Sequence, residues 1–151
     1  MEPTYWRNRV EEMNLRQRSL FVLPRPDLSS PAVDVAEIRI RAHDGLRLSG
    51  MTGRCKLGSA ALPARIRMIG AEQALEVDRE AVCDGFCDIA IQVPEGRRLE
   101  DRVLDVMRAC QTASEMEGVD PTRVSFVFRP DDTEPDEVRI ASQLLSHGLE
   151  F

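Results

Sequence analysis

Several residue types are scarce in this 151-residue sequence, and each scarcity narrows the range of possible functions. The chain has two His, one Trp, one Tyr and five Phe, so aromatic residues make up only 5% of it. Sheet proteins that read single-stranded nucleic acid usually use stacking aromatics, and a net charge of −6 also disfavours such a partner. No apolar run approaches the roughly 18 residues that a membrane helix requires. We therefore expect neither nucleic acid nor a membrane as the partner.

The first 20 residues are rich in charged side chains and lack the apolar segment of a signal peptide. We expect a cytoplasmic protein, in which Cys55, Cys83, Cys87 and Cys110 stay reduced. Cys83 and Cys87 form a C-x3-C pair, but no second pair or nearby His completes a tetrahedral metal site. The cysteines are best interpreted as small core residues, and we expect no metal and no cofactor.

The length and a composition of 42% hydrophobic and 30% charged residues predict one folded domain over 1–151. A chain of this size buries about 68–70% of its unfolded surface, which is enough for a core without disulfides or metals. Residues 1–31 are expected to form an N-terminal helix and a Pro-containing connection, and residues 32–151 the α/β core. In the helix, predicted over 4–23, the apolar positions Trp6, Val10, Met13, Leu20 and Phe21 fall near helical spacing.

Apolar and basic residues alternate with a period of two after this connection. Ile38 and Ile40 alternate with arginines, and the Asp44-Gly45 dipeptide then predicts a hairpin turn into a second alternating run. A third run surrounds Ile66. These runs predict a half-solvated antiparallel region whose wet face has an arginine stripe, consisting of Arg39, Arg41, Arg47, Arg65 and Arg67. Residues 38–67 hold seven basic residues and one acidic residue, a local net charge of +6 in an acidic chain.

The second half of the chain has the pattern of a parallel sheet. Residues 88–93 and 124–128 are short apolar runs of the kind buried on both faces of such a sheet. Between them, apolar residues from Leu99 to Ala113 keep helical spacing and predict a right-handed crossover helix. A last helix is predicted over 135–147, with acidic residues in its first turn.

This order of elements resembles the first half of an α/β-hydrolase, in particular the acetyl xylan esterases, cephalosporin deacetylases and dienelactone hydrolases. The resemblance rests on the aromatic pair Tyr5-Trp6, on the hairpin from Glu37 to Gly50, and on three later segments, 63–68, 85–96 and 119–124. It implies half of an α/β-hydrolase-like sheet, with a helix and a hairpin first, then mostly parallel strands with crossover helices in a three-layer αβα arrangement.

The resemblance places the nucleophile of these enzymes directly after residues 126–128, in a Gly-x-Ser-x-Gly turn that needs small residues around a strained serine. The sequence reads Arg-Pro-Asp-Asp-Thr-Glu-Pro there, so Pro130 and Asp131 stand at a degenerate nucleophile position. The oxyanion loop, which usually opens with His-Gly, is replaced by Ile69-Gly70. The resemblance further implies that the acid and histidine of the triad belong to strands beyond Phe151. His43 and His147 are interpreted as a turn residue and a helix-end residue, and we predict no catalytic residue.

Three hypotheses for function remain open. The first is a non-catalytic α/β-hydrolase-like binding or structural subunit, a homo-oligomer or part of a larger protein complex, whose last strand would otherwise be an exposed edge. The second is part of a split or divergent esterase completed by a partner chain, or a carboxylate site built from Asp88, Asp131, Asp132 and Glu134. The third is an anion- or nucleic-acid-binding module that uses the arginine stripe.

Overall fold

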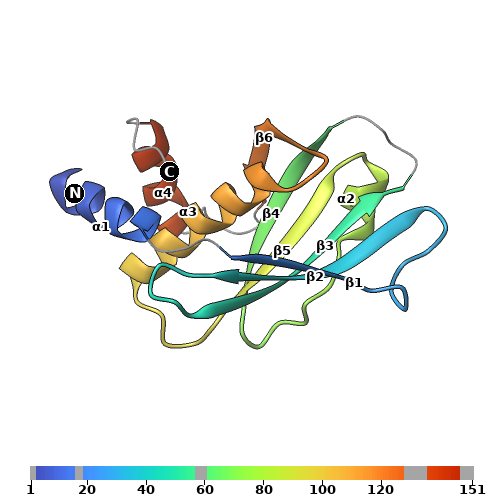
Figure 1. Ribbon diagram of the computed structural model, residues 1–151, viewed down its shortest axis with the longest axis horizontal. Coiled ribbons are helices and arrows are strands. Elements are labelled where there is room, and N and C mark those ends of the chain that lie inside the picture. The colour runs from blue at the N-terminus through green and yellow to red at the C-terminus, as the bar shows by residue number, and fades with distance from the viewer. Residues whose placement is uncertain (1–2, 16–18, 57–60, 128–135, 147–151) are drawn as a thin grey trace.

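A computed structural model of the chain describes residues 3–15, 19–56, 61–127 and 136–146. A six-stranded sheet in the order β1-β2-β3-β5-β4-β6 forms its centre (Figure 1). The elements along the chain are α1 (Pro3–Leu15), β1 (Leu20–Pro24), β2 (Val33–Arg41), β3 (Arg47–Cys55), β4 (Leu62–Gly70), α2 (Arg79–Cys83), β5 (Cys87–Val93), α3 (Leu99–Glu115), β6 (Val119–Phe126) and α4 (Asp136–Ser146).

The predicted hairpin is confirmed as β2 and β3, which pair antiparallel with Arg41 opposite Arg47. Its turn closes through a hydrogen bond from the Ala42 N–H to the Leu46 carbonyl at 2.8 Å. Gly45 has a φ of +85°, a conformation that residues with a Cβ rarely adopt. The Asp-Gly dipeptide predicted the turn correctly because this position of the turn requires a positive φ, which glycine adopts readily.

The prediction that three strands form an antiparallel region is wrong for the third strand, β4. β4 does not lie beside β3, because β5 is inserted between them, antiparallel to β3 and parallel to β4. Alternation along β4 reveals which side chains share a face, since successive residues point to opposite sides. The alternation does not reveal which strand lies beside β4. The prediction of an antiparallel neighbour was wrong for this reason.

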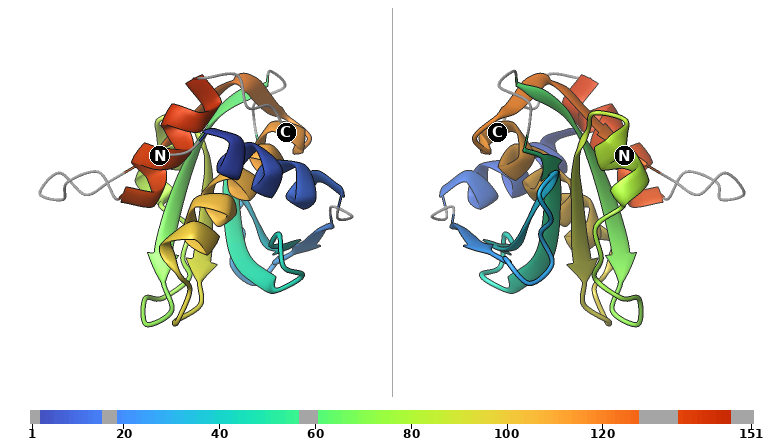
Figure 2. Two further views of the ribbon diagram at one scale, coloured as in Figure 1. Left: turned by 90° about the vertical axis from the view of Figure 1, so that its left-hand side faces the viewer. Right: turned by 90° about the vertical axis from the view of Figure 1, so that its right-hand side faces the viewer.

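Helices cover the sheet unequally on its two faces (Figure 2). On one face, α3 packs against a core that includes Ile38, Ile66 and Ile89. The outer side of α3 packs against α1 and α4 through residues such as Trp6, Leu104 and Val138. Of the described helices, only the short α2 lies on the opposite face, together with the segment before it. The predicted α/β architecture with helices on both faces is confirmed, and none of the described helices is long and apolar enough to cross a membrane.

The N-terminal helix is shorter than predicted. α1 ends at Leu15, and residues 20–24 form β1, which pairs antiparallel with β2. The prediction of a helix through Phe21 is wrong because an apolar run of four residues, Leu-Phe-Val-Leu, fits a strand as well as a helical stripe. Pairing with β2 decides between the two in favour of the strand.

The last strand also differs from its prediction. β6 begins at Val119, five residues earlier than expected, and pairs with β4 at the edge of the described sheet. The strand was expected to be buried on both faces. This is wrong, because residues Pro121 to Arg123 and Ser125 are exposed. α3 and α4 lie where they were predicted, although Pro135 and His147 fall outside the described residues.

A buried ion pair fixes the segment that crosses the less covered face. Asp88 on β5 is fully buried and accepts hydrogen bonds from Nε and Nη2 of Arg67 on β4, at 3.0 and 2.8 Å. The same carboxylate accepts the Asp78 N–H, and Arg67 also donates to the Glu76 carbonyl. Asp78 in turn caps α2, a helix that the sequence analysis missed. The pair therefore joins two strands to residues 76–78.

We predict that Asp88→Ala lowers the free energy of unfolding by about 3 kcal/mol, because the half-buried Arg67 loses its counter-ion and residues 76–78 lose their anchor. Chemical denaturation followed by circular dichroism measures this difference. Asp34→Ala is the control, since it removes an ion pair with Lys56 that is largely exposed, and it should cost about 0–1 kcal/mol. Equal effects of the two substitutions would contradict the anchoring role.

Candidate functional site

The topology places a crevice at the carboxyl ends of the parallel strands. The connection that leaves β4 runs over the face with α2, whereas β6 leads to α4 on the opposite face. In open α/β sheets, ligands bind where neighbouring strands send their connections to opposite faces. β5 leads to α3 on the same face as α4, so β4 differs in this respect from both of its neighbours, and the carboxyl end of β4 is therefore the candidate functional site.

A cavity of about 270 Å³ opens at this end of the sheet. It lies beside the carboxyl ends of β4 and β5 and reaches the first turns of α3 and α4. Its walls are formed by Met68, Ile69, Gly70, Ala71, Glu72, Val93, Pro94, Glu95, Gly96, Arg97, Arg102 and Glu137. Arg102 donates to the Arg97 carbonyl at 2.8 Å. Its Nε lies 3.7 Å from Glu137 Oε1, and this ion pair connects α3 to α4.

The loop after β4 is closed on itself. The Gly70 N–H donates to Gln73 Oε1 at 2.8 Å, and the Gln73 N–H donates back to the Gly70 carbonyl at 3.1 Å. A Cβ placed on Gly70 would lie 2.6 Å from Glu72 Oε1, which shows how closely that carboxylate approaches the backbone. A negative charge here opposes the stabilisation of a second negative oxygen, the task of an oxyanion loop.

Arg97, which forms part of the wall of this cavity, connects the hairpin turn to α3. It donates from Nε and Nη2 to the fully buried carboxylate of Asp105, at 3.1 and 2.7 Å, and from Nη1 to Asp44. Burial raises the pKa of Asp105 above its ordinary value, although the hydrogen bonds from Arg97 oppose this. Arg97 is itself largely buried, but its two carboxylate partners outweigh burial and raise its pKa.

His43 makes a polar pair that the sequence did not reveal. Its Nε2 lies 2.9 Å from Asp101 Oδ1, although 58 residues separate the two along the chain. Burial disfavours the charged form of Asp101, but the hydrogen bond with His43 and the charges of Arg97 and Arg98 outweigh it and lower its pKa. The sequence signal at position 43 was only the turn, and the distant partner could not be inferred from it.

The ligand atoms of His43, Asp44 and Asp101 lie within 4.8 Å of one another and so form a geometric candidate for metal binding. Asp44 is already bonded to Arg97, and Arg9 and Arg98 lie 4.0 and 3.6 Å from Asp101. Three arginines beside two carboxylates leave little net negative charge for a divalent cation. The neighbouring cavity of about 660 Å³ has no Ser, Thr or Cys among its described lining residues, so the His–Asp pair has no nucleophile to activate there.

The five arginines of the predicted stripe share one face of the sheet, as their registers show. Their surroundings differ, however. Arg67 is bonded to Asp88, Arg65 lies 4.5 Å above the Phe86 ring, and Arg39 approaches Glu37 at 3.4 Å. The two exposed arginines, Arg41 and Arg47, lie opposite each other at the hairpin end. β5 separates Arg65 and Arg67 from the other three.

The remaining predicted site residues are not brought together in the described part of the chain. Pro130, Asp131, Asp132 and Glu134 lie outside the described residues, and Asp88 is committed to Arg67. All four cysteines are free thiols. Burial raises the pKa of Cys87 and of Cys110, which makes both thiols less reactive.

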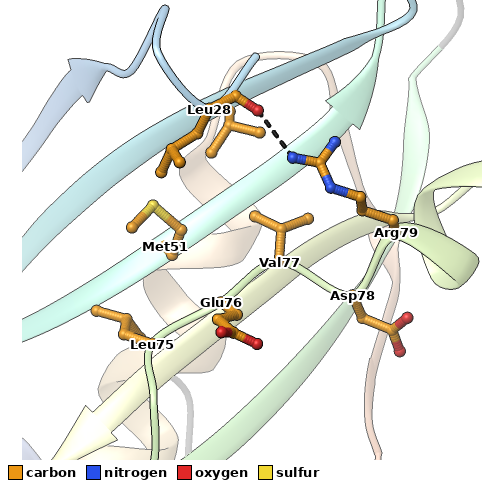
Figure 3. Close-up of a pocket in the computed structure, with 8 residues that line it drawn as sticks. Leu28, Met51, Leu75, Glu76, Val77, Asp78 and Arg79 are labelled. Carbon is orange, nitrogen blue, oxygen red and sulfur yellow. Dashed lines mark hydrogen bonds between the residues drawn. The ribbon is translucent and has the colours of Figure 1, made fainter. Parts of the chain in front are cut away.

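A third cavity, of about 570 Å³, lies on the face that carries α2 (Figure 3). Met51 and Val77 point into it, while the carboxylates of Glu76 and Asp78 turn away. Arg79 donates from Nη2 to the Leu28 carbonyl at 2.8 Å across its rim. This bond ties the β1–β2 connection to the segment that Arg67 and Asp88 hold in place.

Solved structures share this fold. The acetyl xylan esterase from Paenibacillus sp. R4 matches 83% of this chain with a TM-score of 0.72 and 17% identity, over 50% of its own length. Acetyl xylan esterase 1 from Thermoanaerobacterium sp. JW/SL YS485 matches 82% with a TM-score of 0.70 and 17% identity, over 48% of its length. The glucuronoyl esterase from Solibacter usitatus matches 78% with a TM-score of 0.55 and 8% identity, over 50% of its length.

The chain thus has an esterase-like α/β-hydrolase fold and spans about half the length of these enzymes. No protein-family model and no curated protein matches its sequence. At such low identity the similarity establishes the fold and carries no residue roles.

We predict that Asp101→Asn lowers the free energy of unfolding by about 1–2 kcal/mol at neutral pH, because the hydrogen bond with His43 loses its ionic acceptor. Since folding lowers the pKa of Asp101, its stabilisation is fully present above the unfolded value of about 3.9 and is lost as the pH falls through the folded value. The difference between wild type and variant, measured by denaturation at several pH values, should therefore shrink in acid. Asp136→Asn, which removes an exposed i,i+3 pair with Arg139, should show only a small difference. A constant difference from pH 7 to pH 3 would contradict the interpretation.

Proposed function

We propose that this chain is a non-catalytic α/β-hydrolase-like subunit that self-associates or docks on a larger partner. The observation that carries the proposal is the loop after β4, where the carboxylate of Glu72 lies against Gly70 and the Gly70 N–H is bonded to Gln73. An oxyanion loop needs N–H groups aimed at a developing negative charge. The loop after β4 instead places a negative carboxylate beside the backbone and engages the Gly70 N–H within the loop.

The sequence after β6 supports the same conclusion. A nucleophile turn needs small residues beside a serine because the backbone is strained there. Pro130 and Asp131 occupy this position, and Thr133 stands between two acidic residues, Asp132 and Glu134. Acidic neighbours disfavour formation of an alkoxide, since they raise the free energy of a second negative charge nearby.

The charged side chains of the crevice are engaged in structural contacts. Arg97 holds Asp44 and Asp105, and Arg102 holds Glu137 and a backbone carbonyl. Both arginines line the cavity, but their contacts with carboxylates neutralise their charges and join the hairpin, α3 and α4. These contacts favour a structural role for the charged side chains over a catalytic role.

The alternative is a split esterase whose remaining strands come from a partner chain. It is favoured by the position of β6, which pairs with β4 alone among the described strands and leaves its other edge open. The matched esterases are about twice as long as the segment that they share with this chain. Under this alternative, the partner would have to supply a nucleophile as well as the acid and the histidine.

An anion-binding role is a second alternative. Arg41 and Arg47 lie opposite each other in the hairpin, and like charges in this position are destabilising unless an anion neutralises them. The other three arginines of the stripe already have contacts within the chain. Two cations make a weak site for a polyanion, because each neutralised phosphate contributes separately to affinity.

We predict that the purified chain does not hydrolyse p-nitrophenyl acetate above the rate of the buffer, because no described residue combines a nucleophile with a base and oxyanion donors. Release of p-nitrophenolate measures this. The exposed thiol of Cys83 can be acetylated once by the reagent, so Cys83→Ser should remove any initial burst without changing the steady rate. Multiple turnovers that a single substitution abolishes would overturn the non-catalytic assignment.

A further inference from the structure

Among the described residues, four consecutive exposed apolar side chains lie on β1. Leu20, Phe21, Val22 and Leu23 are 39%, 64%, 49% and 42% exposed, and the strand contains no charged residue. Since successive residues point to opposite faces, the strand is apolar and exposed on both. Natural edge strands are usually protected by charges, and an unprotected one marks an association surface.

The outward backbone groups of β1 follow from its pairing with β2. The Arg25 N–H donates to the Val35 carbonyl at 2.9 Å, so the alternate residues Leu23 and Phe21 also direct their polar backbone groups toward β2. Leu20 and Val22 therefore direct their N–H and C=O groups to the free edge. Pro24 offers only its carbonyl there, which suits proline at an edge position.

The opposite edge of the sheet differs in chemistry. The exposed positions of β6 are Pro121, Thr122, Arg123 and Ser125, so this edge has a proline and a charge. These are the features that discourage strand addition. Of the two edges, β1 is the one that favours association through apolar contacts.

The segment after β1 is held firmly against the body of the protein. Arg25 pairs with Asp27, Ser29 Oγ accepts the Val35 N–H at 2.9 Å, and Arg79 donates to the Leu28 carbonyl (Figure 3). Because these bonds fix the strand in advance, pairing with another strand requires little further ordering.

We infer that β1 pairs antiparallel with β1 of a second copy about a two-fold axis at Val22, an inference that rests on the proposed association and names its partner. Each copy then donates from the Val22 and Leu20 N–H groups to the Val22 and Pro24 carbonyls of the other. Val22 faces its own equivalent, and Phe21 faces Leu23 of the second copy. Every cross-strand pair in this register is apolar, so no like charges meet.

The charges beside β1 lie on β2 and are kept apart from the junction in this arrangement. Phe21 lies opposite Arg39, and Leu23 lies opposite Glu37, on β2. The two-fold register therefore places Arg39, Phe21, Leu23 and Glu37 in one row across the junction, the first two from one copy and the last two from the other. The charged ends of each row lie three strand spacings apart, about 14 Å, and Glu37 is already paired with Arg25 and Arg39 of its own copy, so these charges do not oppose the dimer and its stability rests on the apolar centre.

Sedimentation velocity tests the inference with the full chain at micromolar concentration. We expect a dimer for the wild type, and Val22→Lys should raise the dimer dissociation constant by about 100-fold or more, because two ammonium groups then meet at the axis. Leu46→Lys is the matched control: Leu46 is 40% exposed in the hairpin turn and belongs to neither edge strand, so its substitution should leave the dimer intact. Circular dichroism verifies that both variants are folded.

Disulfide formation tests the register. In the Cys83→Ser background, Val22→Cys should form an intermolecular disulfide under mild oxidation, since facing Cα atoms of a hydrogen-bonded pair lie about 5.5 Å apart. Ser125→Cys on β6 should not. A monomeric wild type, a dimer that Val22→Lys leaves unchanged, or cross-linking through β6 would each overturn the inference. The hydrolysis assay is independent of all three outcomes, so a failure here leaves the non-catalytic assignment to be judged on its own measurement.

Discussion

The ion pair between Arg67 and Asp88 is the interaction on which the arrangement of this molecule depends. It joins the neighbouring parallel strands β4 and β5, and through the Asp78 N–H and the Glu76 carbonyl it holds the segment that crosses the sheet. Gln92 adds to this by donating its amide to the carbonyls of Ala71 and Gln73. The residues after β4 are therefore directed over the face that carries α2, and the cavity at the carboxyl ends of β4 and β5 lies where this connection leaves the sheet. A buried pair of this kind is costly to break on one side only, so it fixes one arrangement.

The same constraint supports the proposal that the polar groups of the cavity have a structural rather than a catalytic role. With residues 70–78 fastened to Arg67, Asp88 and Gln92, the loop after β4 closes through Gly70 and Gln73 and brings the Glu72 carboxylate against the backbone. The arginines nearby are paired with buried or partly buried carboxylates. An esterase-like α/β-hydrolase fold is thus retained in a chain whose polar groups hold elements together, while the exposed apolar strand β1 lies at the far edge of the sheet.

Much of the fold could be predicted from the sequence because the relevant signals are local. The Asp44-Gly45 turn, the spacing from Leu99 to Ala113 and the apolar run of β5 each reflect neighbours along the chain. The insertion of β5 between β3 and β4 could not be predicted, since alternation reveals a face and not a neighbour. β1 was missed because four consecutive apolar residues fit two structures, and the pairs His43–Asp101 and Arg67–Asp88 were missed because their members lie far apart in the sequence. The arginine stripe was identified correctly as one face, but the contacts that engage Arg39, Arg65 and Arg67 came only with the structure.

The central claim is that this hydrolase-like fold serves association through its β1 edge. Amide hydrogen exchange of Val22, followed residue by residue at increasing protein concentration, tests it most directly, because the Val22 N–H faces the free edge and is protected only when a second strand covers it. The account predicts that exchange at Val22 slows markedly as the concentration rises through the micromolar range, while exchange at Thr122 on β6 stays the same. Exchange at Val22 that is fast and independent of concentration would contradict it.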